Sequence, residues 1–285
     1  MKNSPPLKLT DKVEEAIQLA SRTPIRKSDL PKLKNIAVWL QELNPKKIAL
    51  TESLPVRRDM VTLLKYIQEK RPVGTQSTGN LQLKAVREIC AQFVNPPLLD
   101  EKIGDKVYKL RSEEHIWSLF FLHRIASTGG LAIGGQARVW KLNQAGEVFL
   151  ELPTPVQLGV MLAVWWHQED WTIAFPVSGL SQGLPRDFRK ITLARLLELK
   201  VGKSVSFEQL ADELIIMTRL TWPSADQTFV QDIMRSVIER LVIYPLTEFG
   251  CLECEYKTRT RYGFKSKDLV EIRLTQIGKG LLETL

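Results

Sequence analysis

Long hydrophobic runs are missing from this 285-residue sequence. The most apolar stretch covers only residues 158–166, whereas a helix that spans a membrane needs about 20 apolar residues. Residues 1–6 also lack the apolar run that is typical of a signal peptide. We therefore expect a protein that has no membrane partner and works in the cytoplasm.

Cysteine is scarce too. Three cysteines cannot form the disulfide framework of a small secreted protein, which favours a reducing compartment. Cys251 and Cys254 have the spacing of half a zinc site, but a structural site needs four ligands. The sequence has no second pair of this kind, and Cys90 and the three histidines lie far away along the chain. The sequence thus predicts no metal and no other cofactor.

Common catalytic motifs are absent as well. The glycine pairs at 129–130 and 134–135 look like a phosphate-binding loop, but no Lys-Ser/Thr step of a P-loop follows them. The sequence contains no nucleophile elbow, zinc-protease or kinase signature. We expect a protein that is not an enzyme. A metal-dependent enzyme assembled from scattered residues is the alternative.

Positive charge, in contrast, is abundant in the first half of the chain. Lys and Arg number 40 against 32 Asp and Glu, which gives a net charge of +8. Residues 1–150 hold 24 basic and 15 acidic side chains, while residues 151–285 hold 16 and 17. A basic half joined to a neutral half indicates that one end meets an anionic partner, most commonly nucleic acid. The alternative is ordinary solubility charge on exposed helices.

Hydrophobic periodicity predicts a mainly α protein with small β-hairpins. The period changes to two within residues 131–142 and 256–272, so we expect a hairpin in each segment. Pro245 is expected to end the helix before it. The expected helices cover residues 10–21, 28–40, 56–70, 81–93, 112–128, 157–166, 187–199, 207–218, 225–242 and 276–282, with a short further helix after Asn143.

Two segments share one layout, in which a helix, a turn and a hairpin are followed by a similar hexapeptide. The hexapeptides are KLNQAG at 141–146 and RLTQIG at 273–278. In both, a basic residue and Leu end a strand, Asn or Thr caps a helix, and Gly follows three residues after the cap. The match predicts an internal repeat.

This layout resembles a winged-helix domain, a helix-turn-helix variant whose final hairpin is the wing. The resemblance covers residues 78–152 and 206–285, and it gives the helix at 225–242 the place of the recognition helix in the second copy. It implies two winged-helix-like domains that follow a basic helical N-terminal region. The expected parts are therefore residues 1–72 (basic region), 73–152 (first domain), 153–205 (apolar helical connector) and 206–285 (second domain).

The first of these domains has a second resemblance. The residues TGNL at 78–81, Val86, RSE at 111–113 and the Gly-rich turn before Leu142 are similar to a segment of uncharacterised bacterial plasmid proteins. That family is the open-reading-frame-three-like family of a root-inducing plasmid. The likeness implies a bacterial or mobile-element origin and no particular chemistry.

The wing of the second domain is rich in cations, with aromatic residues between them. Because side chains alternate along a strand, residues 257, 259 and 261 are expected to share one face, which can reach phosphates or a narrow minor groove. The alternative is a solvated hairpin whose aromatic rings pack on its own body. The candidate nucleic-acid-binding residues of the wing are Lys257, Arg259, Arg261, Lys265 and Lys267.

Two further groups of candidates lie on helices. Gln231 and Arg235 are one turn apart in the expected recognition helix and are side chains that read bases, although Asp232 and Glu239 on the same helix oppose contact with phosphates. The remaining candidates are basic pairs near helix starts, which suit a phosphate backbone or simply an exposed face, namely Lys46, Lys47, Arg57 and Arg58.

The sequence therefore favours a non-enzymatic protein that binds nucleic acid, most commonly double-stranded DNA, through phosphate contacts. A role in transcription control or in a mobile-element or defence assembly is compatible with this function. The alternative is a scaffold or complex subunit whose winged helices bind a protein partner or a second copy of the chain. The acidic residues on the helix at 225–242 and the neutral C-terminal half favour that alternative.

Overall fold

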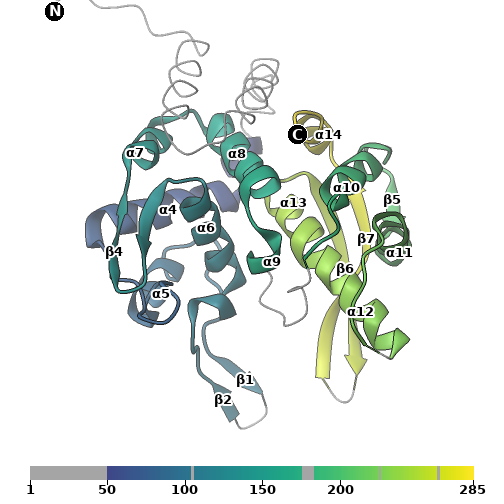
Figure 1. The fold of residues 1–285 in the computed structure, drawn as a ribbon, viewed down its shortest axis with the longest axis horizontal. Coiled ribbons are helices and arrows are strands. Elements are labelled where there is room, and N and C mark those ends of the chain that lie inside the picture. The colour runs from purple at the N-terminus through teal and green to yellow at the C-terminus, as the bar shows by residue number, and fades with distance from the viewer. Residues whose placement is uncertain (1–49, 104–105, 175–182, 225, 262–263) are drawn as a thin grey trace, which may run out of the picture. The chain divides into compact units, whose positions relative to one another are not determined.

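The structure, a computed structural model, describes residues 50–103, 106–174, 183–224, 226–261 and 264–285 (Figure 1). The helices expected at 10–21 and 28–40 lie outside these residues. The chain divides into two compact units, Met1–Glu169 and Asp170–Leu285, which we call unit 1 and unit 2. The expected parts 73–152 and 206–285 each lie within one unit, and the expected connector 153–205 is divided between the two.

The fold is mainly helical with small antiparallel sheets, as the sequence predicts. Within the described residues, two sheets have two strands each, and a third has three strands in the order β5-β7-β6. Among the same residues, no helix combines the length and the apolar character that a bilayer crossing requires.

Unit 1 buries one face of α4 and most of α6 in its core. Met60, Leu63, Leu64 and Ile67 of α4 are all fully buried, because their spacing places them on one side of the helix. The elements are α4 (Pro55–Lys70), α5 (Leu83–Cys90), β1 (Glu101–Ile103), β2 (Lys106–Tyr108), a 3-10 turn (Glu113–His115), α6 (Trp117–Thr128), β3 (Ala132–Gly135), β4 (Arg138–Leu142), α7 (Gln144–Glu151), α8 (Thr154–Ala163) and a π-helical turn (Val164–Gln168).

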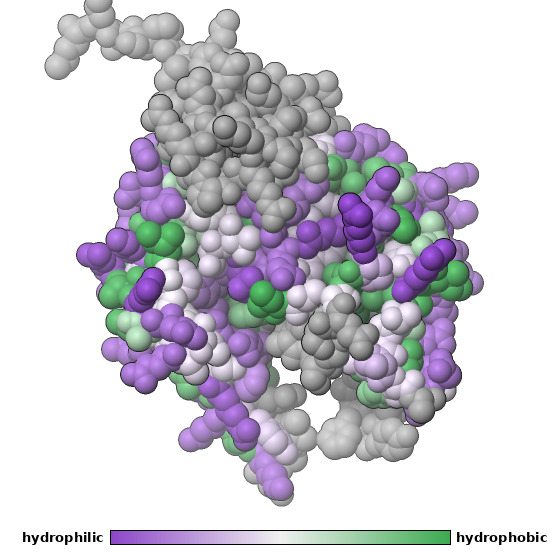
Figure 2. Space-filling model, viewed as in Figure 1, coloured by the Kyte–Doolittle hydropathy of each residue, from purple (hydrophilic) through white to green (hydrophobic). Residues whose placement is uncertain are grey.

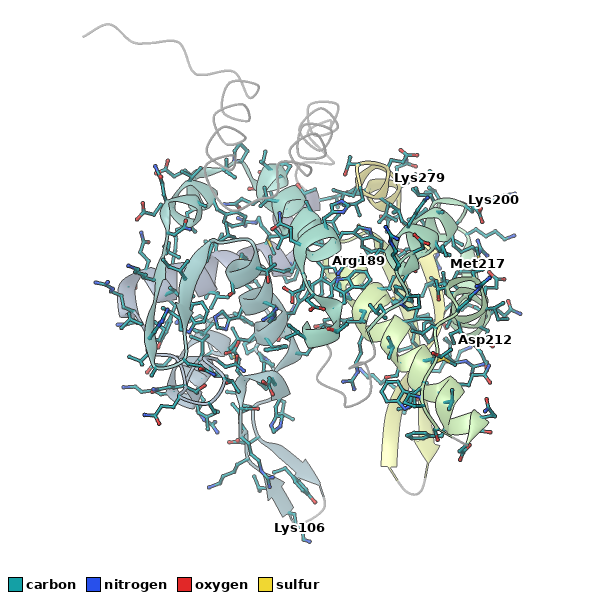
Figure 3. The ribbon with its side chains drawn as sticks, in the orientation of Figure 1. Lys106, Arg189, Lys200, Asp212, Met217 and Lys279 are labelled. Atoms are coloured by element: carbon teal, nitrogen blue, oxygen red, sulfur yellow. The ribbon has the colours of Figure 1, made fainter. Side chains whose placement is uncertain are left out.

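Unit 2 packs its helices against the three-stranded sheet. Trp171 lies in its core, edge-on to Phe188 with the Arg189 guanidinium over its ring; Arg189 is labelled in Figure 3. The elements are α9 (Trp171–Ala174), α10 (Phe188–Leu197), β5 (Ser204–Ser206), α11 (Phe207–Thr218), α12 (Gln227–Ile238), a π-helical turn (Glu239–Ile243), α13 (Tyr244–Glu248), β6 (Leu252–Arg261), β7 (Phe264–Leu274) and α14 (Gln276–Glu283).

Two of the expected helix boundaries are wrong. The helix expected at 112–128 is interrupted at Ile116, whose φ of −106° and ψ of 84° are not helical. Pro245 does not end the preceding helix but lies in the first turn of α13. The π-helical turn before it breaks the usual hydrogen-bond pattern, so the missing N–H of proline costs little there.

The internal repeat is present in the structure and is longer than the hexapeptides indicate. In unit 2, β5 lies between α10 and α11 and pairs with β7, the second strand of the hairpin. In unit 1, residues 73–74 lie between α4 and α5, and Val73 bridges Val139 in β4, again the second strand of the hairpin. Each unit thus has the order helix, short strand or isolated bridges, helix, helix, hairpin and short helix. The β1–β2 hairpin of unit 1 and α13 of unit 2 are additions to this order. The repeat therefore begins at α4 and α10.

The hexapeptides mark the same junction in both units. Asn143 N–H donates to the Leu131 carbonyl over 3.2 Å, and Thr275 N–H donates to the Cys251 carbonyl over 3.0 Å. The Asn143 and Thr275 side chains then cap α7 and α14, as the sequence predicts. The carbonyl oxygen before each hairpin is thus held against the start of the helix that follows it.

The glycine of each hexapeptide is required by this close approach. A Cβ at Gly146 would lie 2.1 Å from the Leu131 oxygen, and a Cβ at Gly278 would lie 2.1 Å from the Cys251 oxygen. No side chain fits at such a distance. The spacing of cap and glycine is therefore a consequence of how the hairpin packs on the final helix.

Candidate nucleic-acid interface

The β6–β7 hairpin of unit 2 is a long antiparallel ribbon. Its register pairs Leu252 with Leu274 at one end and Arg261 with Phe264 at the other. The third strand, β5, pairs only with residues 271–273 of β7. Beyond Glu255 and Glu271 the hairpin is therefore two-stranded, and it leaves the rest of the sheet (Figure 1). This outer part, residues 256–269, is called the ribbon below.

The register divides the ribbon's basic residues between two faces. Residues opposite each other in an antiparallel pair lie on the same face. Lys257, Arg259 and Arg261 pair with Asp268, Ser266 and Phe264, while Lys265 and Lys267 pair with Thr260 and Thr258. The first three residues thus share one face, as predicted, and the last two occupy the other face.

Only two of these five side chains are among those that the structure describes. Lys257 and Lys267 are both exposed. Lys267 borders a hollow of about 420 Å³ that is also lined by Glu208, Arg235 and Glu239. Burial raises the pKa of Glu239. Because this hollow carries charges of both signs, it does not select an anion.

The two candidates for base contact on α12 are engaged within unit 2. Arg235 binds Asp212 of α11 through two hydrogen bonds of 2.7 Å and also forms an ion pair with Glu208 at 2.7 Å. Gln231 donates to the same Asp212 carboxylate over 3.1 Å. The hydrogen bonds from Arg235 lower the pKa of Asp212, so the pair is strongly held. Both side chains must leave Asp212, which is labelled in Figure 3, before they can contact a base.

Apolar side chains are exposed at the same end of unit 2. Ile216 and Met217 near the end of α11 are 77% and 48% exposed, and Phe229 in the first turn of α12 is 51% exposed. Hydrophobic residues elsewhere on the face in Figure 2 are scattered among hydrophilic ones. Exposed apolar groups at this position favour contact with protein over contact with phosphates.

The hairpin of unit 1 differs from the ribbon because residues 73–80 pack along it, although most residues of β3 and β4 stay exposed. Gly74 N–H donates to the Arg138 carbonyl over 2.8 Å, and the Gln136 side chain donates to the Ser77 carbonyl over 2.8 Å. A Cβ at Gly74 would lie 2.1 Å from the Gly135 oxygen, and one at Gly134 would lie 2.3 Å from the Trp140 ring. Of the glycines that resemble a phosphate loop, Gly134 thus makes room for the Trp140 ring, and the carbonyl of Gly135 lies against Gly74.

The basic pairs near the N-terminus have different surroundings. Lys46 and Lys47 lie outside the described residues. Arg57 is half-buried and donates to the Gln157 side chain of α8 over 3.3 Å, and burial lowers the pKa of its guanidinium. Arg58 is exposed. Of this pair, Arg58 is therefore the residue that is free to meet a phosphate.

The cysteine pair is part of the core of unit 2. Cys251 is buried, and Cys254 is partly buried with its sulfur 3.1 Å from the Thr247 hydroxyl. Burial raises the pKa of both thiols. Within the described part of the chain, no three His, Cys, Asp or Glu side chains gather as potential metal ligands.

Sequence reasoning misses a buried polar pair in unit 1. Glu113 is turned into the core, where its Oε1 lies 2.7 Å from His123 Nδ1 and its Oε2 accepts from Leu81 N–H over 2.5 Å. The sequence places His115 and His123 on similar faces, but His115 is exposed and His123 is buried. Many helices begin with an acidic residue and carry a histidine ten residues later, so the sequence alone does not predict that Glu113 and His123 are in contact.

No family model, curated protein or solved structure matches this chain. Its function must therefore be inferred from the geometry of the two units. That geometry divides the basic residues of the ribbon between its two faces, places Arg58 in the other unit, and engages Gln231 and Arg235 with acids.

Proposed function

We propose that the protein binds double-stranded nucleic acid, namely DNA. In this proposal it is not an enzyme, and it works in the cytoplasm. Contact is made mainly with phosphates, through the ribbon of unit 2 and through Lys and Arg near the N-terminus, including Lys46, Lys47 and Arg58. The observation that carries this proposal is the ribbon itself. It is a two-stranded, basic segment that extends past β5, and a two-stranded β-ribbon is an element that the major groove of DNA admits.

The order of elements supports the resemblance to a winged helix. Both units follow the order described above, with isolated bridges at residues 73–74 in the place of β5, and in unit 2 the hairpin is long and leaves the sheet. In this proposal the ribbon is the wing that meets the nucleic acid. The shorter hairpin of unit 1, against which residues 73–80 pack, has a structural role.

The engagement of α12 with α11 argues for binding without strong sequence preference. Base readout needs Arg, Gln, Asn or Lys side chains that are free to reach base edges. Arg235 and Gln231 are held by Asp212 and Glu208. Affinity from phosphates alone is independent of sequence and depends on salt.

The salt dependence of binding tests this function. If the protein contacts three to five phosphates, its affinity for a labelled duplex should fall by about 40- to 500-fold between about 50 and 200 mM salt. Duplexes of unrelated sequence should bind with similar affinity. Fluorescence anisotropy measures both quantities. Absence of binding at the lower salt, or binding that salt leaves unchanged, would contradict the proposal.

A second candidate function rests on the exposed apolar surface of Ile216, Met217 and Phe229. In that function the protein is a subunit that binds another protein, or a second copy of itself, through this end of α11 and α12. Asp212 and Glu208 hold Arg235 in place there, so the helix offers apolar surface and few free cations. An apolar interface of this kind keeps its affinity in salt, which distinguishes it from the first function.

A further inference from the structure

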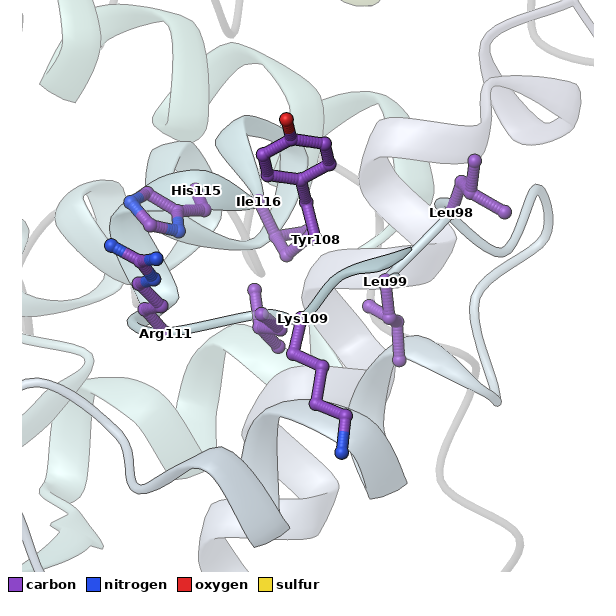
Figure 4. Close-up of a pocket in the computed structure, with 8 residues that line it drawn as sticks. Leu98, Leu99, Tyr108, Lys109, Arg111, His115 and Ile116 are labelled. Carbon is purple, nitrogen blue, oxygen red and sulfur yellow. The ribbon is translucent and has the colours of Figure 1, made fainter. Parts of the chain in front are cut away.

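An open pocket lies in unit 1, in the segment that separates α5 from α6. This segment contains the β1–β2 hairpin, which has no counterpart between α11 and α12 in unit 2. The pocket has a volume of about 420 Å³ (Figure 4). Leu98, Leu99 and Ile116 contribute its apolar lining, and its polar lining comes from the end of β2 and from the 3-10 turn before α6.

The polar lining is basic. Lys109, Arg111 and His115 border the pocket, and none of the Asp and Glu residues that the structure describes does so. All three side chains are exposed. Among the described residues none of them forms an ion pair, and Asp100 nearby in sequence is held by Arg87 at 2.9 Å and by Leu110 N–H at 3.0 Å. Lys109 acts on the Asp100 carboxylate, whose pKa it helps to lower, so Arg111 is the cation of the pocket for which no carboxylate partner is described.

An aromatic ring also lines the pocket. Tyr108 is 50% exposed. Figure 4 shows Arg111 and His115 on one side of the pocket, Leu98 and Leu99 on the other, and the Tyr108 ring between them. A pocket lined by an exposed ring and a guanidinium can accept both a flat aromatic group and a phosphate.

We propose that this pocket binds one unpaired nucleotide, with its base stacked on Tyr108 and its phosphate held by Arg111 and His115. The proposal rests on the function proposed above, because it concerns the same class of ligand. A free mononucleotide and the unpaired end of a nucleic acid share this chemistry. The exposure of the lining residues leaves room for a strand to continue out of the pocket, which favours the strand end.

Duplexes with and without a short single-stranded overhang test this inference. By fluorescence anisotropy at about 50 mM salt, the overhang should tighten binding by about 10-fold, since base stacking on an aromatic side chain is worth about 5- to 150-fold per base. Tyr108→Ala and Arg111→Gln should abolish this gain and leave blunt-duplex binding within about 2-fold. Tyr108→Phe keeps the ring and should keep the gain.

Lys84→Gln, which removes an exposed cation of α5 outside the pocket, is the charge control and should also keep the gain. AMP is added as a competitor at up to about millimolar concentration. If AMP removes the gain and binds the pocket as tightly as the overhang does, the pocket is assigned to free mononucleotides. An overhang without effect, or a gain that survives Tyr108→Ala and Arg111→Gln, would overturn the inference. If blunt duplexes do not bind but overhangs bind in a Tyr108-dependent way, the result supports the nucleotide pocket and contradicts duplex binding by the ribbon.

Discussion

Glu113→Ala is expected to lower the free energy of unfolding of unit 1 by about 3 to 5 kcal/mol. Glu113 is 1% exposed and connects two segments of the core, because it bonds both Leu81 N–H and His123 Nδ1. Alanine leaves both groups buried without a partner, at about 1 to 3 kcal/mol each, in addition to the cavity. His123 also lies edge-on to Trp140 at 4.3 Å, so the loss extends to β4.

Urea unfolding measures this change, and hydrogen exchange of the α6 amides assigns it to unit 1. The neighbouring Glu114 is a matched control, since its carboxylate accepts from the Asn80 side chain and is itself partly exposed. Glu114→Ala should cost about 1 kcal/mol or less. Equal effects of the two substitutions would contradict the structural role of Glu113.

Gly146→Ala and Gly278→Ala are each expected to destabilise their unit by about 2 to 3 kcal/mol. Alanine is the better helix former by about 1 kcal/mol, so a rule based on helix propensity predicts the opposite sign. The steric reason is the carbonyl oxygen 2.1 Å from the new Cβ in both units. The helix start must move away, and the hydrogen bonds from Asn143 N–H and Thr275 N–H weaken with it.

Thermal or urea unfolding of the full chain shows directly whether each glycine substitution lowers or raises the free energy of unfolding. Glu147→Ala and Gln276→Ala change exposed positions of the same two helices and should alter stability by about 0.5 kcal/mol or less. A stabilising effect of either glycine substitution would show that its junction is not built as described. A loss at one glycine only would show that the repeat is not equivalent in the two units.

The sequence predicts features whose cause is local. Asn143 and Thr275 cap the helices they are expected to cap, because a cap depends on residues within one turn. The two predicted hairpins form for a similar reason, since alternation and flanking glycines act over short distances. The β1–β2 hairpin escapes prediction because its strands are only three residues long.

Features that depend on contacts between distant segments are not predicted. The sequence shows that Arg235 is on a helix, but only packing of α11 against α12 brings Asp212 to it. The division of the ribbon's cations between two faces depends on the register and on the bulge after Glu255, which moves the alternation by one position. The helices at 56–70 and 187–199 are predicted as helices but not as parts of the repeat, because a helix needs only apolar periodicity, whereas the junction needs a particular glycine.

The central claim is that the ribbon contacts the phosphates of a duplex, and its charge provides the most direct test. Fluorescence anisotropy compares the wild type with a triple variant, Lys257→Ala, Arg259→Ala and Arg261→Ala, on one labelled duplex. A control variant removes the same charge from exposed positions of unit 2 outside the ribbon, namely Lys190, Lys200 and Lys203.

If the ribbon binds phosphates, the ribbon variant should weaken binding by at least about 10-fold at about 50 mM salt. It should also lower the salt slope by up to about 3, one for each phosphate that its side chains no longer neutralise. The control variant should stay within about 3-fold of wild type, because it changes only the long-range field. Equal losses of affinity in the two variants, or no loss in either, would contradict the claim that the ribbon contacts nucleic acid.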